Sequence, residues 1–319
     1  MNQLRGTPAR LSIILAFLSV YFCWSATYTA MRVGVELLPA TVLAGVRMLI
    51  GAVIMLGFCA MRGRNIFYAR NIMGRLMLLG VMLLFGGNIG LVWSEKYLSS
   101  GLAALIVAVV PLYVAIIEIA SPKGDRLRPQ GYFGLALGFC SLLALLWPSL
   151  RNGVEGHPMQ IIAIMAILAG SFCWASGSVL SRRMNLPVDP LVAAGWEMFA
   201  AGIANVFFAT VFRQWPHAVW NSLSIVSVGY LIVFGSLLGF TAYIWLIAHV
   251  PVSKVATYAY VNPMIAVVLG AVVLHEKLAP TEYFGMVAII ISVALVTSSK
   301  LTSGKEVAQA ECAPVESEA

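Results

Sequence analysis

Long apolar runs alternate with short polar segments along almost the whole chain. Ten such runs are present, at residues 11–30, 39–61, 76–93, 101–120, 131–148, 159–180, 191–212, 224–248, 255–274 and 283–299. Each approaches the roughly 20 residues that an α-helix needs to cross the ~30 Å hydrocarbon core of a bilayer. Because hydrocarbon offers no partners for backbone N–H and C=O groups, the runs should be helical. The pattern therefore predicts an all-α membrane protein with ten transmembrane helices.

Short motifs of the first half return in the second half at a nearly constant spacing. Phe22-Cys23-Trp24 recurs as Phe172-Cys173-Trp174 after 150 positions, and Tyr132-Phe133-Gly134 recurs as Tyr283-Phe284-Gly285 after 151. Each half holds five runs, and because five is odd, the second half must enter the membrane from the opposite face. The sequence therefore predicts two inverted five-helix repeats, a plan that many secondary transporters share.

The repeat sets the expected organisation of the chain. We expect a cytoplasmic N-terminal segment at 1–10, a first repeat at 11–148, a connecting loop at 149–158 and a second repeat at 159–299. The polar tail at 300–319 is predicted to be disordered. The first run has the form of a signal-peptide core, but its counterpart in the second half favours a helix that is kept.

Composition and charge agree with this picture. The chain is 61% hydrophobic and 10% charged, whereas soluble domains are about 45–50% apolar and about 25% charged. If the runs cross a membrane, 14 of the 20 Lys and Arg residues fall in loops on one side and five on the other, with Arg47 inside a run. The positive-inside rule then predicts that both termini are cytoplasmic.

Several functional classes find no support in the sequence. The net charge of +7 is spread over loops, without a basic stretch interleaved with aromatic residues that would indicate a nucleic-acid partner. The five cysteines and four histidines show no metal-ligand spacing, so we expect no metal site. The chain also lacks a P-loop, a dinucleotide fingerprint, an HExxH motif and a nucleophile elbow. We therefore expect neither an enzyme nor a cofactor.

Two charged residues interrupt the apolar runs at mirrored positions. Arg47 lies in the second run, and Glu197 lies in the seventh, 150 residues later. A charge near the bilayer centre is costly and seldom faces lipid. Either the two residues face a cavity and couple transport to a proton or bind a charged substrate group, or they form structural pairs that hold the halves together. Glu95 and Glu118, at the ends of runs, are expected to reach the membrane interface.

A set of polar and aromatic residues is expected to line a substrate cavity. The amide of Asn88 follows Gly86-Gly87, a pair that also allows close helix packing. Pro111 and Pro263 are mirrored and are expected to kink their helices. Each tryptophan in the set has packing or interface anchoring as an alternative role. The cavity candidates are Trp24, Asn88, Trp174, Tyr243, Trp245, Tyr258, Tyr260 and Asn262.

Four motifs in order resemble a known family. The segment 99–106, SSGLAALI, is followed by Pro111-Leu112; the second half has Ala259-Tyr260-Val261-Asn262-Pro263 and then His275-Glu276-Lys277-Leu278. Gly124-Asp125-Arg126-Leu127 is the first-half counterpart of the last motif. Together with ten runs in an inverted duplication, these motifs resemble the EamA-type permeases of the drug/metabolite transporter superfamily, and most nearly their YedA-like inner-membrane branch. His275 stands where the family often has glycine.

The resemblance implies a multi-pass permease of the bacterial cytoplasmic (inner) membrane, with a cavity lined by the first, third, fourth, sixth, eighth and ninth helices. It also implies export of small metabolites such as amino acids or toxic compounds. The expected mechanism is alternating access, either facilitative or coupled to protons, with Glu197 as the first candidate for the coupling group. Because the two halves already supply both sides of the cavity, we expect that a monomer could function. A membrane-embedded sensor that binds a ligand without moving it is the alternative.

Overall fold

The computed structural model describes residues 10–121, 128–154, 158–276 and 280–311, with a few side chains inside these ranges excepted. All regular structure in these ranges is helical. Eight helical segments are long and apolar enough to cross a membrane, and two shorter apolar helices, at 261–273 and 283–296, complete the ten. The predicted all-α membrane fold with ten spanning helices is therefore confirmed.

The first five spans comprise eight helical elements. They are α1 (Arg10–Leu37); α2 (Ala40–Met61); α3 (Arg70–Gly80), η1 (Val81–Gly86) and α4 (Gly87–Ser94), which form the third span; α5 (Ser100–Val107) and α6 (Val110–Ala120), which form the fourth; and α7 (Pro129–Val154). Helix α7 continues beyond residue 148, where the connecting loop was expected to begin.

The second five spans follow the same plan. They are α8 (Pro158–Met184); α9 (Pro190–Val211); α10 (Ser222–Tyr230), η3 (Leu231–Phe240) and α11 (Thr241–His249), which form the eighth span; α12 (Val252–Val255) and α13 (Tyr258–Val273), which form the ninth; and α14 (Pro280–Glu311). A single 3₁₀ turn, η2 (Trp215–His217), lies between α9 and α10. Helix α14 extends into the expected C-terminal tail, and residues 312–319 lie outside the described ranges.

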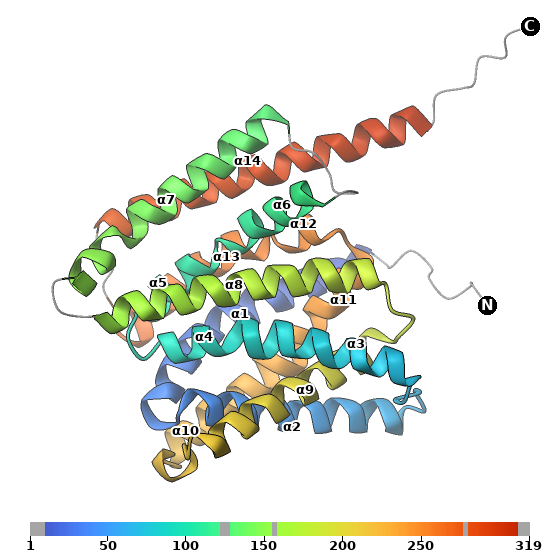
Figure 1. Ribbon diagram of the computed structural model, residues 1–319, viewed down its shortest axis with the longest axis vertical. Coiled ribbons are helices and arrows are strands. Elements are labelled where there is room, and N and C mark those ends of the chain that lie inside the picture. Colours follow the sequence, from blue (N-terminus) through green and yellow to red (C-terminus); the bar gives the residue numbers. More distant parts are fainter. Residues whose placement is uncertain (1–9, 122–127, 155–157, 277–279, 312–319) are drawn as a thin grey trace, which may run out of the picture.

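Helix packing repeats across the two halves. The two most extensive helix contacts join α2 to α9 and α7 to α14, and each pair consists of counterparts from the two repeats. Figure 1 shows α7 and α14 side by side along one edge of the bundle, with α2 and α9 together at the opposite edge. Helix α4 packs on α8, and its counterpart α11 packs on α1, as does the neighbouring segment η3. This exchange of partners is what an inverted repeat requires.

The two ends of the bundle can be told apart by the chain ends. Helix α1 begins and α14 ends at the same end, on the right in Figure 1. We call this the terminal end, and we call the opposite end, where α4 ends and α5 begins, the distal end. Ten spans are an even number, so the chain returns to the side from which it started.

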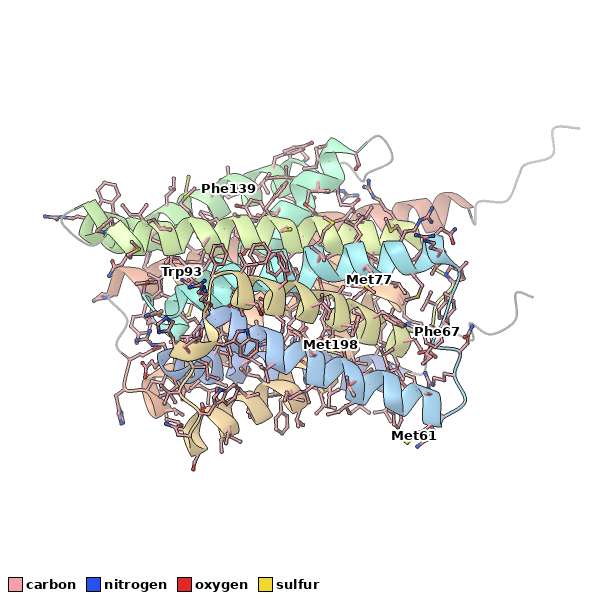
Figure 2. All side chains as sticks on the ribbon, turned by 60° about the horizontal axis from the view of Figure 1, so that its bottom comes forward. Met61, Phe67, Met77, Trp93, Phe139 and Met198 are labelled. Carbon is pink, nitrogen blue, oxygen red and sulfur yellow. The ribbon has the colours of Figure 1, made fainter. Side chains whose placement is uncertain are left out.

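The flanks of the bundle are apolar and exposed. Large side chains on them include Phe133, Leu143, Phe207 and Phe284, which are 60% to 75% exposed. In Figure 2 most of the nitrogen-bearing side chains lie near the two ends, with Met61 and Phe67 at one end and Trp93 toward the other. Such a surface would be unstable in water and suits contact with lipid chains.

Irregular helical segments occur at matching places in the two repeats. The third span contains the π-helical segment η1, and the eighth contains the π-helical segment η3. Because π-helical turns widen a helix and shift side chains around its axis, they commonly occur at functional sites. Here they immediately precede or contain residues that line the central cavity described below.

The two mirrored prolines differ in their surroundings. The fourth span is interrupted at Ala108 and Val109, and Pro111, the second residue of α6, cannot donate a backbone hydrogen bond across this interruption. In the ninth span the interruption lies at Ala256 and Thr257, whereas Pro263 lies inside the continuous helix α13. The break near Pro263 therefore occurs six residues before it.

His275 adopts a backbone conformation that explains the glycine usual in the resembling family. Its φ angle is 56°, in the left-handed region that glycine enters without steric cost. The turn closes with a hydrogen bond from the Glu276 N–H to the Gly270 carbonyl, at 3.1 Å. The carboxylate of Glu276 is thereby directed toward the beginning of α5.

Candidate functional site

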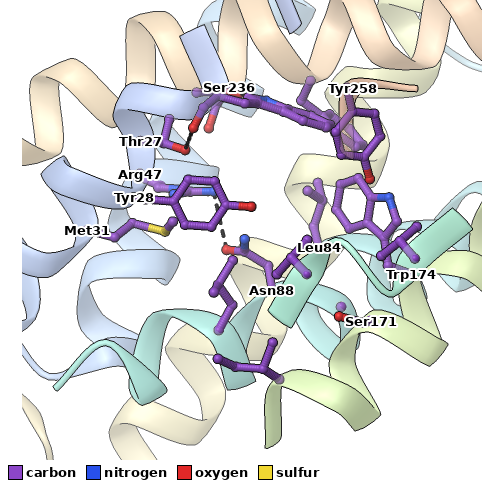
Figure 3. A pocket seen from close by; sticks show the side chains of 18 of the residues that line it. Thr27, Tyr28, Met31, Arg47, Leu84, Asn88, Ser171, Trp174, Ser236 and Tyr258 are labelled. Carbon is purple, nitrogen blue, oxygen red and sulfur yellow. Dashed lines mark hydrogen bonds between the residues drawn. The ribbon is translucent and has the colours of Figure 1, made fainter. Parts of the chain in front are cut away.

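A cavity lies between the two repeats, near the middle of the bundle. Its volume is about 70 Å³, which is enough for several water molecules. Figure 3 shows its lining side chains converging from both halves. The lining residues are Trp24, Thr27, Tyr28, Met31, Arg47, Met48, Leu84, Gly87, Asn88, Leu91, Val107, Val110, Ile167, Ser171, Trp174, Gly235, Ser236, Phe240 and Tyr258.

These residues come from the first, third, fourth, sixth, eighth and ninth spans, as expected, and in addition from the second span, through Arg47 and Met48. Several of them were not among the residues predicted to line the cavity, although the sequence contains a signal for them. Thr27, Tyr28 and Met31 follow Trp24 by three, four and seven residues, which places all four on one face of a helix.

Aromatic rings form one side of the cavity. The two tryptophans of the sequence repeat, Trp24 and Trp174, meet edge to face with ring centroids 5.5 Å apart. Trp24 also contacts Tyr258, at 5.3 Å, and Tyr243, at 5.0 Å. Separations of this size lie in the favourable range for aromatic pairs. The repeated Phe-Cys-Trp motif therefore brings the two halves together at the centre of the molecule.

The polar edges of both tryptophans are already bonded within the protein. The Trp24 indole N–H donates to the Gly235 carbonyl at 3.1 Å, and the Trp174 indole N–H donates to the Tyr243 hydroxyl at 2.9 Å. Tyr243 does not line the cavity; it supports Trp174 from behind and also bonds to Ser178 at 2.7 Å. The tryptophans therefore offer apolar ring surface to the cavity.

Two mirrored glycines make room for these rings. A Cβ atom at Gly87 would lie 3.0 Å from Trp174 Cβ and Cε3, and a Cβ atom at Gly239 would overlap the Trp24 indole. Gly87 and Gly239 belong to the third and eighth spans, which also carry the π-helical segments. Small residues at both positions are therefore a condition for the aromatic side of the cavity.

The opposite side of the cavity is polar and centres on Arg47. One terminal nitrogen, Nη2, donates to the Asn88 side-chain oxygen at 3.3 Å, and Figure 3 shows the two side chains facing each other beside Tyr28. Arg47 is 6% exposed, and its Nε has no hydrogen-bond partner. Thr27, Ser171 and Ser236 add hydroxyl groups to the lining. The cavity thus combines a buried cation with apolar aromatic surface.

Glu197 occupies a different environment from Arg47. It is 1% exposed, lies outside the cavity lining, and its Oε2 has no hydrogen-bond partner. Arg47 and Glu197 both belong to the described residues, and no ion pair joins them. Direct pairing between these mirrored residues is therefore not what holds the two halves together.

Glu95 is buried, contrary to the expectation that it reaches the membrane interface. It follows the last residue of α4 and is 0% exposed, and neither carboxylate oxygen has a hydrogen-bond partner. Burial, reinforced by the negative charge of Glu276, raises the pKa of Glu95 well above its usual value, against the opposing effect of Arg32 and Arg47. Arg32 instead donates a hydrogen bond to the Glu95 backbone carbonyl. The fold thus encloses a carboxyl group near the distal end of the cavity.

Contacts between the repeats occur at both ends of the bundle. At the distal end, Glu276 accepts hydrogen bonds from the Ser100 N–H at 2.9 Å and the Ser100 hydroxyl at 2.7 Å, and so caps α5. At the terminal end, Arg64 pairs with Asp189 at 2.5 Å and Arg183 pairs with Glu118 at 3.5 Å. Each of these contacts joins one repeat to the other.

Two further cavity candidates, Trp245 and Asn262, lie away from the lining. Trp245 stacks on His249 with centroids 4.3 Å apart. Asn262 is buried, and with its amide nitrogen directed at the Tyr21 and Tyr258 carbonyls it donates to both at 3.2 Å, which joins the ninth span to the first. The side chain of Tyr260 lies outside the part that the structure describes.

Metal-binding clusters and a second hollow are the other possible sites in the described part of the chain. Within the described residues, no group of three or more His, Cys, Asp and Glu side chains is arranged to hold a metal ion. An apolar hollow of about 270 Å³ lies between α1, α10 and α13, lined by residues such as Val33, Leu223 and Val273. Both repeats line this hollow too, but none of its described lining residues is charged, whereas the central cavity contains Arg47.

The chain matches the sequence profile of a known family in two places. The sequence profile of the EamA-like transporter family matches residues 11–147 and again residues 161–298. The two matches together cover most of the chain, and they nearly coincide with the two predicted repeats.

Two similar proteins carry names that describe a transporter or an efflux pump. The uncharacterized inner membrane transporter YedA of Escherichia coli is 32% identical over 285 residues, which cover 89% of this chain and 90% of YedA. A probable amino-acid metabolite efflux pump of Escherichia coli is 23% identical, over 87% of this chain and 91% of the pump. A solved crystal structure has a TM-score of 0.68 at 20% identity, covers 92% of this chain and 99% of its own, and shares the fold.

Proposed function

Because the chain belongs to the EamA-like transporter family, we propose that it is a secondary transporter of the bacterial inner membrane, without enzymatic activity, that exports small metabolites. Its relatives are named as transporters, one of the inner membrane and one for efflux of amino-acid metabolites. The family supports membrane transport, and the substrate, the direction and the mechanism belong to the proposal.

The observation that carries the proposal is the cavity between the two inverted repeats. Both halves contribute to it, with Trp24, Arg47 and Asn88 from the first and Ser171, Trp174 and Tyr258 from the second. A site at the interface of inverted repeats is exposed to opposite sides of the membrane when one half rocks against the other. The cavity residues are therefore the proposed substrate-binding residues.

The contacts between the repeats suggest how access to the cavity alternates between the distal and the terminal end. Opening the distal end would break the bonds from Ser100 to Glu276, while opening the terminal end would break the pairs Arg64–Asp189 and Arg183–Glu118. The pairs at the terminal end are partly exposed, and exposed ion pairs each contribute only about 0–1 kcal/mol. Such contacts can close an end without making its opening prohibitively costly.

A flux experiment tests the proposal. The purified protein is first screened for thermal stabilisation by amino acids and small organic acids, and the stabilising compounds are then tested for counterflow in proteoliposomes. We expect Ser171→Phe, which places a ring in the cavity, to reduce counterflow to the level of protein-free vesicles. Met165→Phe is the matched control, because Met165 lies on the same helix with 58% of its surface exposed.

The outcomes separate transport from its alternatives. Stabilisation of the wild-type protein without counterflow at any tested pH would indicate a membrane-embedded sensor rather than a transporter. Undiminished counterflow in Ser171→Phe, with Met165→Phe behaving alike, would show that the substrate takes a route other than this cavity.

Coupling to protons is part of the proposal, with Arg47 and Glu197 as the candidate residues. Both are buried charges within spans, which usually serve function or structure rather than contact with lipid. In the same vesicles under an imposed pH gradient, Glu197→Gln is expected to remove the response to the gradient. An unchanged response in this variant would exclude Glu197 as the proton carrier.

A further inference from the structure

We propose that the cavity binds a small organic monocarboxylate, with the carboxylate against Arg47 and the apolar body against Trp24, Trp174 and Tyr258. The inference rests on the proposed function in that it names the substrate class of the same cavity. The charge of the lining, the free donors of Arg47 and the chemistry of the aromatic side support it.

The charge of the lining selects for an anion. Arg47 is the one charged side chain among the cavity residues that the structure describes, and it is 6% exposed. A buried guanidinium is costly unless a negative group compensates it. Glu95 is near enough to interact with Arg47 electrostatically, but Glu95 and Glu197 lie outside the lining, and no ion pair joins either of these described residues to Arg47. A substrate carboxylate can supply the missing contact, whereas an ammonium group would be repelled.

The hydrogen-bond donors of Arg47 also favour an anionic ligand. A guanidinium has five N–H donors in a planar fork that matches a carboxylate with two parallel hydrogen bonds. The structure uses one terminal nitrogen for a 3.3 Å bond to Asn88 and leaves Nε, which is buried, without a partner. A buried donor without a partner costs free energy that a bound acceptor recovers. Donors therefore remain free for an incoming carboxylate.

The other side of the cavity matches the apolar part of such a molecule. Since the indole N–H groups of Trp24 and Trp174 bond to Gly235 and Tyr243, both rings present hydrocarbon surface. The space available also limits the size of the molecule. The cavity measures about 70 Å³, whereas an apolar cavity that holds benzene measures about 150 Å³. Small acids fit the cavity at this size, and a ring requires it to widen.

Matched acids and amides test the charge preference. Binding of propionate and benzoate to the purified full-length protein is measured by isothermal titration calorimetry, next to propionamide, benzamide and benzylamine. Each amide keeps the shape of its acid and lacks the charge. Hydrogen bonds to charged groups imply that at least one acid binds about tenfold or more tightly than its amide. Benzylamine is expected to bind more weakly than benzoate.

Two variants assign the preference to Arg47. Arg47→Gln should bring acid and amide to within about threefold of each other. Asn88→Asp keeps the size of the side chain and places a carboxylate beside the guanidinium, so it should abolish the preference without removing Arg47. Arg62→Gln, an exposed arginine just beyond the same helix, is the control and should leave the preference unchanged. Gel filtration verifies that each variant is folded.

Some results would overturn the inference. Amides or benzylamine binding as tightly as the acids would do so, as would an absence of binding by either acid. An acid preference that persists in both Arg47→Gln and Asn88→Asp would place the anion site elsewhere. Counterflow of some other compound, without acid binding, would overturn the anion site and support the transport function. Arg47-dependent acid binding with no counterflow of any compound would support the anion site and contradict the transport function.

Discussion

Single buried charges have a large influence on a protein whose interior is apolar. Glu95 is enclosed near Arg32, Arg47 and Glu276, and its carboxylate accepts no hydrogen bond. Taking a carboxylate out of water without such bonds favours its protonated form. The raised pKa of Glu95 therefore makes the stability of the fold depend on pH.

The variant Glu95→Gln tests this dependence. In the unfolded chain a glutamate loses its proton near pH 4.3, whereas folded Glu95 keeps its proton to higher pH. Between these two pKa values unfolding releases a proton, so stability falls as pH rises, by at most about 1.4 kcal/mol per pH unit. Glutamine removes this slope. The melting temperature of Glu95→Gln in detergent should therefore rise relative to wild type as the pH increases from about 4.3.

The control for this prediction is Glu118→Gln, which removes a carboxylate at the terminal end of the bundle. It shows how much of any change in melting temperature follows from removing a carboxylate of the bundle in general rather than from removing that of Glu95. If the melting temperatures of Glu95→Gln and the wild type changed with pH in parallel, Glu95 would have the same pKa in the folded and the unfolded chain, contrary to the prediction.

At the scale of the elements, close helix contacts depend on glycine. Gly80, the last residue of α3, packs against the backbone of Glu197 in α9. A Cβ atom at Gly80 would overlap the Glu197 carbonyl oxygen and lie 2.6 Å from its Cα. Backbone atoms cannot rotate away as a flexible side chain can, so the two helices would have to separate. Helix packing in membranes commonly uses small residues in this way.

We therefore expect Gly80→Ala to destabilise the protein by about 1–3 kcal/mol, the usual cost of overpacking. Gly57→Ala is the matched control, because Gly57 lies within α2 and a Cβ atom there would meet nothing within 4 Å. The control should be as stable as the wild type or slightly more stable, since alanine favours helices. Thermal denaturation in detergent measures both variants. Equal melting temperatures for the two would contradict the close approach of α3 and α9.

At the scale of the whole molecule, orientation follows from charge. Helices α1 and α14 have their outer ends at the same end of the bundle. The loops expected on that side carry 14 of the 20 Lys and Arg residues, against five on the other side. Since basic loops tend to stay in the cytoplasm, we propose that the terminal end faces the cytoplasm and the distal end faces the periplasm.

Reporter fusions test this orientation. A green fluorescent protein joined to the C-terminus should fluoresce, and alkaline phosphatase joined there should be inactive, because each reporter matures on one side of the membrane only. Alkaline phosphatase joined after Val154, beyond the fifth span, should be active. The opposite set of activities would invert the assigned orientation, and activity at both sites would contradict an odd number of spans between them.

Much of the architecture was accessible from the sequence because it rests on local composition and on repetition. Ten apolar runs predicted ten spanning helices, and the return of Phe-Cys-Trp predicted the inverted repeat. The same motif placed Trp24 and Trp174 on the cavity, since counterparts near a pseudo-two-fold axis meet at the centre. Asn88, Tyr258 and Arg47 also proved to line the cavity.

Other parts of the site could not be read from single positions. Tyr243 and Asn262 have the polar groups expected of lining residues, yet the structure uses them to bond Trp174 and the Tyr21 and Tyr258 carbonyls. Whether a polar side chain meets the cavity or its neighbours depends on helix rotation. The π-helical segments η1 and η3 alter that rotation, and no pattern in the sequence predicted them.

The sequence by itself determined the number of spans, their helical form and the inverted duplication, because hydrocarbon imposes helices on apolar runs and an odd repeat imposes inversion. Only the tertiary structure decided that Glu95 is enclosed as well as Arg47 and Glu197. Glu95 lies at the end of a run, where its side chain had a free path to water, and Arg32 and Glu276 come from distant parts of the chain. The assembled helices close that path and leave Glu95 fully buried, because burial is a property of assembled helices rather than of any one segment.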